Sequence, residues 1–310
     1  MQCLNPINIR NPDREIGGTL TVPCGRCLAC LSRRRAEWRV RMEIETMHST
    51  SAYFITLTYD ENNVPLNTYR FGSNIDSFEI DSAPADTIIY SVRSVRKTDV
   101  QKFFKRFRKL VSTLESETGT PLEDRAKLRY FLVAEYGKDT LRPHYHFILW
   151  NFPFGKGVLE GALSEAWPFG IFHIGGVDPE SINYCAKYCL TKGGEPYLSD
   201  PVFCFMSRRP GIGYQYTERV EYYGKHINRP DRCFVRDRSG HPVAMPRYYR
   251  LKIFDEDERK YHADEVLSMC EDRDLLLRER YSPEAVERIY DNEKREYVRK
   301  VKKSLIKGKI

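Results

Sequence analysis

The most informative pattern in the chain lies in residues 144–150, which are typical of a strand. In a strand, side chains alternate between the two faces, so His144 and His146 point to one face and Tyr145 and Phe147 point to the other. Residues 128–135 are also typical of a strand. The glycine-containing turn at 137–139 therefore predicts an antiparallel hairpin.

Other segments extend this pattern. Residues 53–59 and 171–177 are rich in β-branched and aromatic residues, which predicts two more strands. Residues 31–47 and most of 256–306 are predicted to be helical. Residues 60–88 are polar and lack a clear period, so we expect an irregular insertion there.

A helical period begins at Thr98, where Thr98 and Gln101 predict a capping box. Apolar residues then recur at helical spacing, and basic residues fill the opposite face. The apolar stripe consists of Val100, Phe103, Phe104, Phe107, Leu110, Val111 and Leu114.

A second amphipathic helix is predicted after Asp178, which would cap it, with Pro179 in the first turn. Tyr184 and Tyr188 lie one turn apart on the face opposite the apolar one. That apolar face consists of Ile182, Cys185, Ala186 and Cys189.

These elements predict an α+β fold with a central antiparallel sheet and flanking helices. We expect three segments. Residues 1–48 form a small cysteine-rich module with a basic helix, and residues 49–200 form the α+β domain. Residues 201–310 form an extension that is mostly helical after residue 256.

The chain has 310 residues and a net charge of +7, and its positive charge is clustered. Such clusters favour a polyanion, because nucleic acid releases counterions when it binds, although a solvated helix face is the alternative. No run approaches 18 apolar residues and the amino terminus does not look like a signal peptide, so we expect no membrane association and a cytoplasmic protein. The predicted DNA-binding residues are Arg33, Arg34, Arg35, Lys102, Lys105, Arg106 and Lys109.

Three of the nine cysteines, Cys24, Cys27 and Cys30, are separated by two residues each. In a reducing compartment this spacing favours a metal site over disulfides. Cys3 would complete a tetrahedral zinc site of structural role, with Cys233 or a histidine as the alternative ligand. An iron–sulfur cluster is also compatible with the spacing.

The two histidines predict a second metal site. Neutral imidazoles at i and i+2 on a strand can share a divalent cation, and a third ligand is then needed. Glu135 is the best candidate, because the hairpin would bring its carboxylate beside them. The mixed nitrogen and oxygen set suits Mg²⁺ or Mn²⁺ acting on a phosphate. Taken alone, a His-x-His pair is more often a surface or packing feature.

The two tyrosines are candidate nucleophiles. A phenol attacks poorly unless a metal, a base or positive charge favours the phenolate, and Lys187 and Lys192 could supply that charge. The alternative is that Tyr184 and Tyr188 simply pack against a neighbouring element. Together with the histidine pair, they predict phosphoryl transfer.

The order of these motifs resembles the HUH superfamily of rolling-circle replication initiation proteins, and above all those of gokushoviruses (Microviridae). The doubled tyrosine is similar to that of the isometric coliphage gene A proteins. The resemblance covers about residues 1–250. Its residues are Cys3, Val22–Cys30 with Trp38, Phe54-Ile55-Thr56-Leu57-Thr58, Glu135-Tyr136-Gly137, Arg142-Pro143-His144-Tyr145-His146, Tyr184-x-x-Lys187-Tyr188, Met206-Ser207-Arg208 and Pro210-Gly211-Ile212-Gly213.

The resemblance implies an HUH endonuclease with a ferredoxin or RRM-like core. It implies that one tyrosine attacks the viral origin in single-stranded DNA, leaving a 3′-hydroxyl and a 5′-phosphotyrosine, and that the second tyrosine takes part in closing a circle. Lys187 matches the family's lysine, and Lys192 is the parallel residue for Tyr188. A host polymerase and helicase would be partners, in the cytoplasm of a bacterial host.

Two other functions remain open from the sequence. One is a zinc-containing nucleic-acid-binding protein without catalysis, which would not depend on the tyrosines. The other is a metal-dependent nuclease that uses activated water, which would need the histidines but would leave no protein on the DNA.

Overall fold

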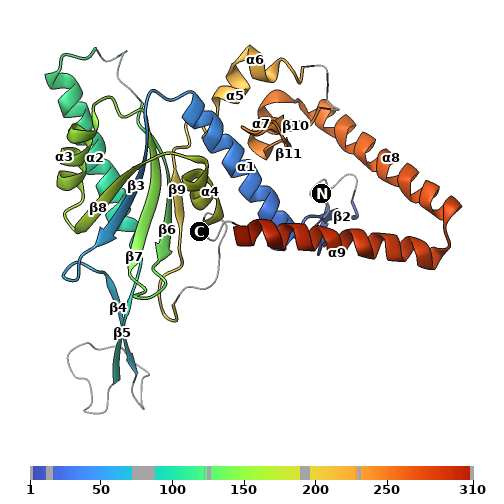
Figure 1. The fold of residues 1–310 in the computed structure, drawn as a ribbon, viewed down its shortest axis with the longest axis horizontal. Coiled ribbons are helices and arrows are strands. Elements are labelled where there is room, and N and C mark those ends of the chain that lie inside the picture. The colour runs from blue at the N-terminus through green and yellow to red at the C-terminus, as the bar shows by residue number, and fades with distance from the viewer. Residues whose placement is uncertain are drawn as a thin grey trace. The chain divides into compact units, whose positions relative to one another are not determined.

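The structure is a computed structural model that describes residues 3–11, 17–71, 88–121, 123, 127–188, 196–227, 229 and 232–307 (Figure 1). The chain forms two compact units. The first unit is built from Met1–His48, Ile182–Ala186 and Arg209–Ile310, and the second from Ser49–Ser181 and Lys187–Arg208.

The second unit is built on a five-stranded sheet in which each neighbouring pair is antiparallel. The strand order is β8-β3-β7-β6-β9, and the predicted hairpin is confirmed as the pair β6 and β7. The predicted α+β class with a central antiparallel sheet is therefore confirmed. The bounds are β3 Ala52–Tyr59, β6 Arg129–Tyr136, β7 Pro143–Trp150, β8 Gly170–Gly176 and β9 Cys204–Met206.

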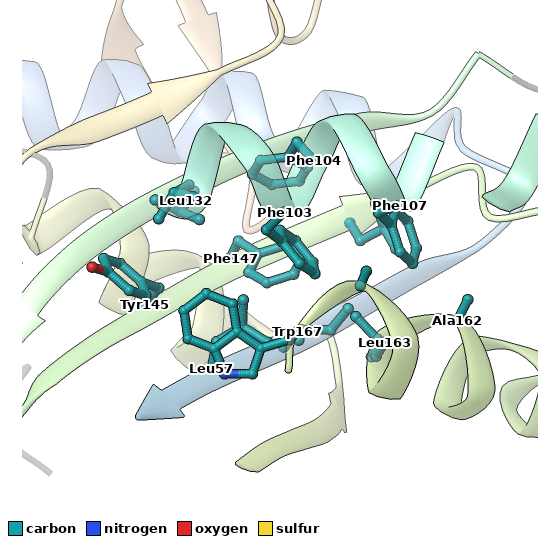
Figure 2. Packing of buried hydrophobic residues seen from close by; sticks show 14 of the residues in the cluster. Leu57, Phe103, Phe104, Phe107, Leu132, Tyr145, Phe147, Ala162, Leu163 and Trp167 are labelled. Carbon is teal, nitrogen blue, oxygen red and sulfur yellow. The ribbon is translucent and has the colours of Figure 1, made fainter. Parts of the chain in front are cut away.

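Two helices, α2 (Lys97–Glu117) and α3 (Lys156–Ala166), cover one face of this sheet (Figures 1 and 2). Strand residues that alternate toward this face, such as Tyr145 and Phe147 of β7, are fully buried. Phe103 of α2 packs edge-on against Phe147, with ring centroids 5.8 Å apart (Figure 2). The predicted apolar stripe of α2 thus supplies the core on this face, and the histidines lie on the other face of the sheet.

Two local predictions in this unit were wrong. The predicted insertion at 60–88 contains strand β4 (Leu66–Phe71), which pairs with β5 (Ile88–Arg93) as an antiparallel ribbon. The capping box at Thr98 does not form, because α2 begins at Lys97 and its N-cap, Arg96, makes no side-chain cap hydrogen bond. The backbone N–H of Arg96 instead donates to the hydroxyl of Tyr145 at 2.8 Å, so a tertiary contact fixes the helix start.

The first unit combines the amino-terminal residues with the carboxy-terminal third of the chain. The basic helix predicted at 31–47 is α1, which starts three residues earlier, and the segment predicted to be helical after 256 is two helices, α8 and α9. Strands β10 and β11 pair around a turn that contains Ser239 and Gly240. The bounds are β1 Ile7–Arg10, β2 Thr19–Val22, α1 Leu28–Met47, α5 Gln215–Glu218, α6 Val220–Tyr223, β10 Phe234–Arg236, β11 Pro242–Ala244, α7 Arg247–Ile253, α8 Glu256–Arg280 and α9 Pro283–Lys307.

Arg41 of α1 lies at the centre of this unit. Its guanidinium sits over the rings of Trp38 and Tyr248, 4.3 and 4.6 Å from their centroids. Its Nε donates to the carbonyl of Ile212 at 2.9 Å. Gly213 has a φ of +72°, and an added Cβ would lie 2.6 Å from the Arg41 carbonyl oxygen, so only glycine fits there. The 210–213 turn is therefore fitted to α1.

Candidate active site

The polar side chains of the candidate site lie on the face of the sheet opposite α2 and α3. Cross-strand pairing places Thr58 beside His144 and Thr56 beside His146, and on the other side it places Glu135 beside His144. Directly paired residues point to the same face of a sheet. The alternation predicted for the histidine strand is therefore present, and three neighbouring strands contribute to one polar patch.

Each imidazole is held by a threonine of β3. Nδ1 of His146 lies 2.9 Å from Oγ1 of Thr56, and Nδ1 of His144 lies 2.9 Å from Oγ1 of Thr58. A hydroxyl can donate or accept, so it can hold either tautomer of the ring. Both Nε2 atoms are thereby directed away from β3.

Glu135 approaches His146 from β6, with Oε1 2.9 Å from Nε2. Each side chain is only 12 % exposed, so this contact is sheltered from water. The hairpin brings the carboxylate beside a histidine, as the sequence predicted. Its role as a metal ligand stays a prediction.

The contact of His146 with Glu135 is a hydrogen bond, and its length can be compared with that expected for two ligands of one cation. Ligand atoms that share one ion at bond lengths of about 2.1 Å lie about 3 Å apart, which matches the separation of Nε2 and Oε1. The His144 ring is 6.2 Å from the His146 ring, at an angle of 37°. It would complete the predicted set of ligands only by a change of ring orientation.

His144 is largely buried beside the second imidazole. Burial lowers its pKa below the ordinary value near 6.5, and the adjacent His146 lowers it further. A neutral ring at pH 7 keeps a lone pair for a metal. Gly137 lies against this ring, because a Cβ there would come 2.9 Å from Nε2 of His144, so a larger residue would displace it.

The tyrosine helix is α4 (Pro179–Tyr188), and its predicted cap is present. The Ser181 amide donates to Oδ1 of Asp178 at 2.7 Å, and the Asp178 amide donates to Oγ of Ser181 at 2.9 Å. Its predicted apolar face is buried at Ile182, Cys185 and Ala186; Cys189 lies outside the described residues.

Tyr184 and Tyr188 are both half-buried on this helix. Nζ of Lys187 lies 5.2 Å from the centroid of the Tyr188 ring, so a cation is close to one phenol. The predicted residue Lys192 lies outside the described residues. The catalytic roles of the tyrosines and of Lys187 stay predictions.

The four amino-terminal cysteines form a second site, in the first unit. Sγ of Cys3 lies 3.5 Å from that of Cys24 and 3.7 Å from that of Cys27. All four ligand atoms, including that of Cys30, lie within 4.8 Å of one another. A zinc ion with Zn–S bonds of about 2.3 Å needs sulfurs about 3.8 Å apart. The cluster could therefore hold a structural metal such as zinc, with Cys3 in the position predicted for it.

The predicted DNA-binding residues have different surroundings. Lys102, Lys105 and Lys109 are exposed on α2, which covers the face of the sheet opposite the histidines. Arg106 donates from Nε and Nη2 to the carbonyl of Ala166, at 3.0 and 2.7 Å, and so anchors the end of α3.

The arginines of α1 belong to the first unit. Arg34 is exposed, whereas Arg33 pairs with Glu37 at 3.6 Å and Arg35 is half-buried. Burial lowers the pKa of Arg35, and Arg39 lowers it further.

Sequence reasoning missed three residues of the histidine face. Thr56 and Thr58 were noted for their β-branched strand character, although the i, i+2 spacing that identifies the histidines applies equally to them. His173 of β8 pairs directly with Thr56 and is exposed on the same face. A lone histidine in a predicted strand gave no indication of this position.

Comparison with known proteins gives one family match and two relatives. Residues 52–193 match the family of the replication-associated protein ORF2. Replication-associated protein VP4 of Bdellovibrio phage phiMH2K is 23 % identical over 277 residues, which cover 81 % of this chain and 76 % of that protein. Replication-associated protein ORF2 of Spiroplasma virus 4 is 24 % identical over 264 residues, which cover 79 % and 72 %.

No solved structure matches the chain. In the part of the chain that the structure describes, no helix is long and apolar enough to cross a membrane. Over about four fifths of its length, this chain is similar to replication-associated proteins of phages, and the family match includes the whole histidine strand and the whole tyrosine helix.

Proposed function

We propose that this protein initiates rolling-circle replication of a small single-stranded DNA phage, by cutting and rejoining one strand at the viral origin. The observation that carries the proposal is the contact of His146 with Glu135 on the face of the sheet opposite α2 and α3, with both imidazoles backed by threonine hydroxyls. This arrangement lies within the segment that matches a replication-associated family. The HUH assignment and its mechanism are part of the proposal.

In the proposed reaction, the phenol oxygen of Tyr184 or Tyr188 attacks the phosphorus of a phosphodiester. The new P–O bond forms as the bond to the 3′-oxygen breaks, which leaves a 3′-hydroxyl and a 5′-phosphotyrosine. The ester energy is conserved, so the reverse attack by a 3′-hydroxyl can reseal the strand without ATP. Lys187 would favour the phenolate or neutralise the phosphate.

His144, His146 and Glu135 would hold the metal ion of this site, Mg²⁺ or Mn²⁺. When bound, such an ion polarises the phosphodiester and orients the attacking oxygen. Thr56 and Thr58 would fix the orientation of the two imidazoles. The amino-terminal cysteines would hold a separate zinc ion with a structural role.

A replication initiator of this kind would act in the cytoplasm of a bacterial host. The 3′-hydroxyl would be extended by a host polymerase, with a host helicase to separate the strands. Two tyrosines one turn apart would allow a second cut after one round of synthesis, while the first remains bound to DNA.

The test is a search for a covalent protein–DNA product. The purified protein is incubated with Mn²⁺ and single-stranded phage DNA fragments labelled at the 3′ end, and products are separated under denaturing conditions. Label that migrates with the protein supports the proposal. The Tyr184→Phe/Tyr188→Phe double variant should lose it, whereas Tyr197→Phe, an exposed tyrosine of the second unit, should retain it.

Two other results would refute the proposal. Cleavage with no label on the protein would indicate a nuclease that activates water. If the protein binds the same DNA fragments but cleaves none of them, it is a nucleic-acid-binding protein without this activity.

A further inference from the structure

The first unit contains a cavity of about 560 Å³ between α1 and the segment that runs from α5 to the β10–β11 hairpin. This volume is within the range of roughly 300–1,000 Å³ that is typical of small-molecule sites. Its lining residues all come from one compact unit, and none of them belongs to the histidine face or to the cysteine cluster.

One wall of the cavity is apolar and aromatic. Val40 and Ile44 of α1 form its base, and Tyr216 and Tyr222 stand beside them. The rings of Tyr216 and Tyr222 are stacked, with centroids 5.1 Å apart and an angle of 19°. The Tyr222 hydroxyl is 2.9 Å from Nε2 of His48, which fixes its orientation. The wall is therefore a flat, ordered surface.

The two acidic residues in the cavity are already bound by the protein. Asp237 pairs with Arg39 and accepts hydrogen bonds from the amides of Ser239 and His241 at 3.0 and 2.9 Å. Glu43 lies 3.7 Å from Nε of Arg39 and accepts from the amide of Arg238 at 3.3 Å. One arginine, Arg39, thus pairs with both acids, and backbone amides satisfy further carboxylate oxygens.

The rim of the cavity is basic. Four cationic side chains line it, and all of them are exposed: Lys225, Arg232, Arg236 and Arg238. These four cations and Arg39 outnumber the two acids, so the opening has an excess of positive charge.

Buried His226 anchors this rim. Its Nδ1 donates to the carbonyl of Arg232 at 2.8 Å, so Nε2 accepts from the hydroxyl of Tyr216 at 2.9 Å. Burial lowers the pKa of His226, and Lys225 and Arg232 lower it further. The neutral ring ties the basic segment to the aromatic wall.

We infer that this cavity binds one nucleotide of single-stranded DNA, with the base against Tyr222 and Phe234 and a phosphate against Lys225 and Arg238. Aromatic surfaces next to cationic side chains are how proteins hold unpaired bases together with their backbone. A membrane surface or an acidic peptide offers negative charge but no flat ring for the aromatic wall. That the ligand is single-stranded DNA rests on the proposed function. The inference adds a DNA contact in the first unit, which does not contain the two histidines.

The experiment uses the full chain with Tyr184→Phe and Tyr188→Phe and without divalent metal, so that no covalent chemistry occurs. Binding of a fluorescein-labelled 12-mer of deoxythymidine is measured by anisotropy at several salt concentrations. Adding Lys225→Gln and Arg238→Gln should weaken binding at least about tenfold. It should also reduce the slope of log affinity against log salt by about 0.7, since one neutralised phosphate contributes about 0.7 for single strands.

The matched control is Arg247→Gln with Lys252→Gln, two exposed basic residues of α7 in the same unit. It should change affinity less than about twofold. Equal losses in the control and in the cavity variant would indicate general charge attraction, and would overturn the inference. Equal melting temperatures verify that both variants are folded.

Three further measurements test whether the cavity holds a base, and whether that base belongs to a DNA strand or to a free nucleotide. Phe234→Leu should weaken binding at least about fivefold, because a lost base–aromatic stack costs about 1–3 kcal/mol. A 12-mer of abasic sites should bind the unsubstituted cavity correspondingly less, and equal binding would overturn the base pocket. Free deoxythymidine monophosphate should compete poorly, and competition as strong as that of the 12-mer would show that the ligand is a free nucleotide.

The outcome can be separated from that of the proposed function. In the background with both tyrosines, the Lys225→Gln/Arg238→Gln protein at saturating DNA should still form the covalent product. If binding to the cavity fails while the product forms, only this inference falls. If no product forms while the cavity binds DNA, only the nicking mechanism falls.

Discussion

Replacing Thr56 by valine tests whether the histidine face is a metal site. Valine keeps the shape and the β-branched character of threonine, so strand β3 should be preserved. It removes the hydroxyl that lies 2.9 Å from Nδ1 of His146. In a neutral His146 ring that donates from Nε2 to Glu135, Nδ1 would accept from the hydroxyl. A metal bound to Nε2 would require the proton on Nδ1, and the hydroxyl would then be its acceptor.

The expected loss of affinity for Mn²⁺ can be estimated from this exchange of donor and acceptor roles between Nδ1 and the hydroxyl. Valine would leave the Nδ1–H of a metal-bound His146 without its acceptor, and an unsatisfied buried donor costs about 1–3 kcal/mol. Loss of an outer partner of a metal ligand typically weakens binding about 10- to 100-fold, which is about 1.4–2.7 kcal/mol. The two estimates agree, so we expect a loss of this size for Mn²⁺.

The assay is calorimetric titration of Mn²⁺ into protein whose cysteine site has first been saturated with zinc. Thr68→Val is the control, because that hydroxyl contacts Ser91 in the β4–β5 ribbon, away from the histidines. An affinity for Mn²⁺ that is unchanged by Thr56→Val, in a variant with an unchanged melting temperature, would show that His146 is not held for a metal.

Four other perturbations have expected outcomes. Cys27→Ser should remove one bound zinc, measured by mass spectrometry of the metal content, and lower the melting temperature, because structural zinc contributes folding energy. Gly213→Ala should reduce the free energy of unfolding in urea by about 3 kcal/mol, since the new Cβ would overlap the Tyr249 hydroxyl at a residue with positive φ. Burial lowers the pKa of His226, so as the pH falls the unfolded chain takes up this proton before the folded protein does. The free energy of unfolding should therefore decrease as the pH drops below about 6.5. His226→Gln should make this decrease with pH smaller. Replacing Lys102, Lys105 and Lys109 of α2 together by glutamine should weaken association of the protein with single-stranded DNA at low salt. The cleavage rate of bound DNA should stay unchanged.

Much of the histidine face could be predicted from local patterns. A period of two places His144 and His146 on one face, and a short turn places Glu135 on the adjacent strand in register with them. The cysteine set was predicted in the same way, because three ligands are close in sequence and Cys3 was the nearest remaining thiol. In each case the relevant contact follows from spacing or from one hairpin.

The features that could not be predicted depend on distant segments. The start of α2 is set by the hydroxyl of Tyr145, which is 49 residues away in sequence from Arg96. The joining of α1 to the carboxy-terminal third relies on Arg41 and the turn at 210–213, about 170 residues apart. No window of sequence carries such a signal, so the cavity of the first unit could not be anticipated either.

The alternation that identified the histidines also limits where DNA can lie. Tyr145 and Phe147 are apolar because α2 covers them, so the outer basic face of α2 must be on the far side of the sheet from His144 and His146. A DNA strand bound along α2 alone would be separated from the candidate site by the whole sheet. Positive charge on α2 can therefore raise the local concentration of DNA, whereas positioning a phosphate for cleavage requires residues on the histidine face itself. His173, exposed there and paired with Thr56, is the residue with which to begin that search.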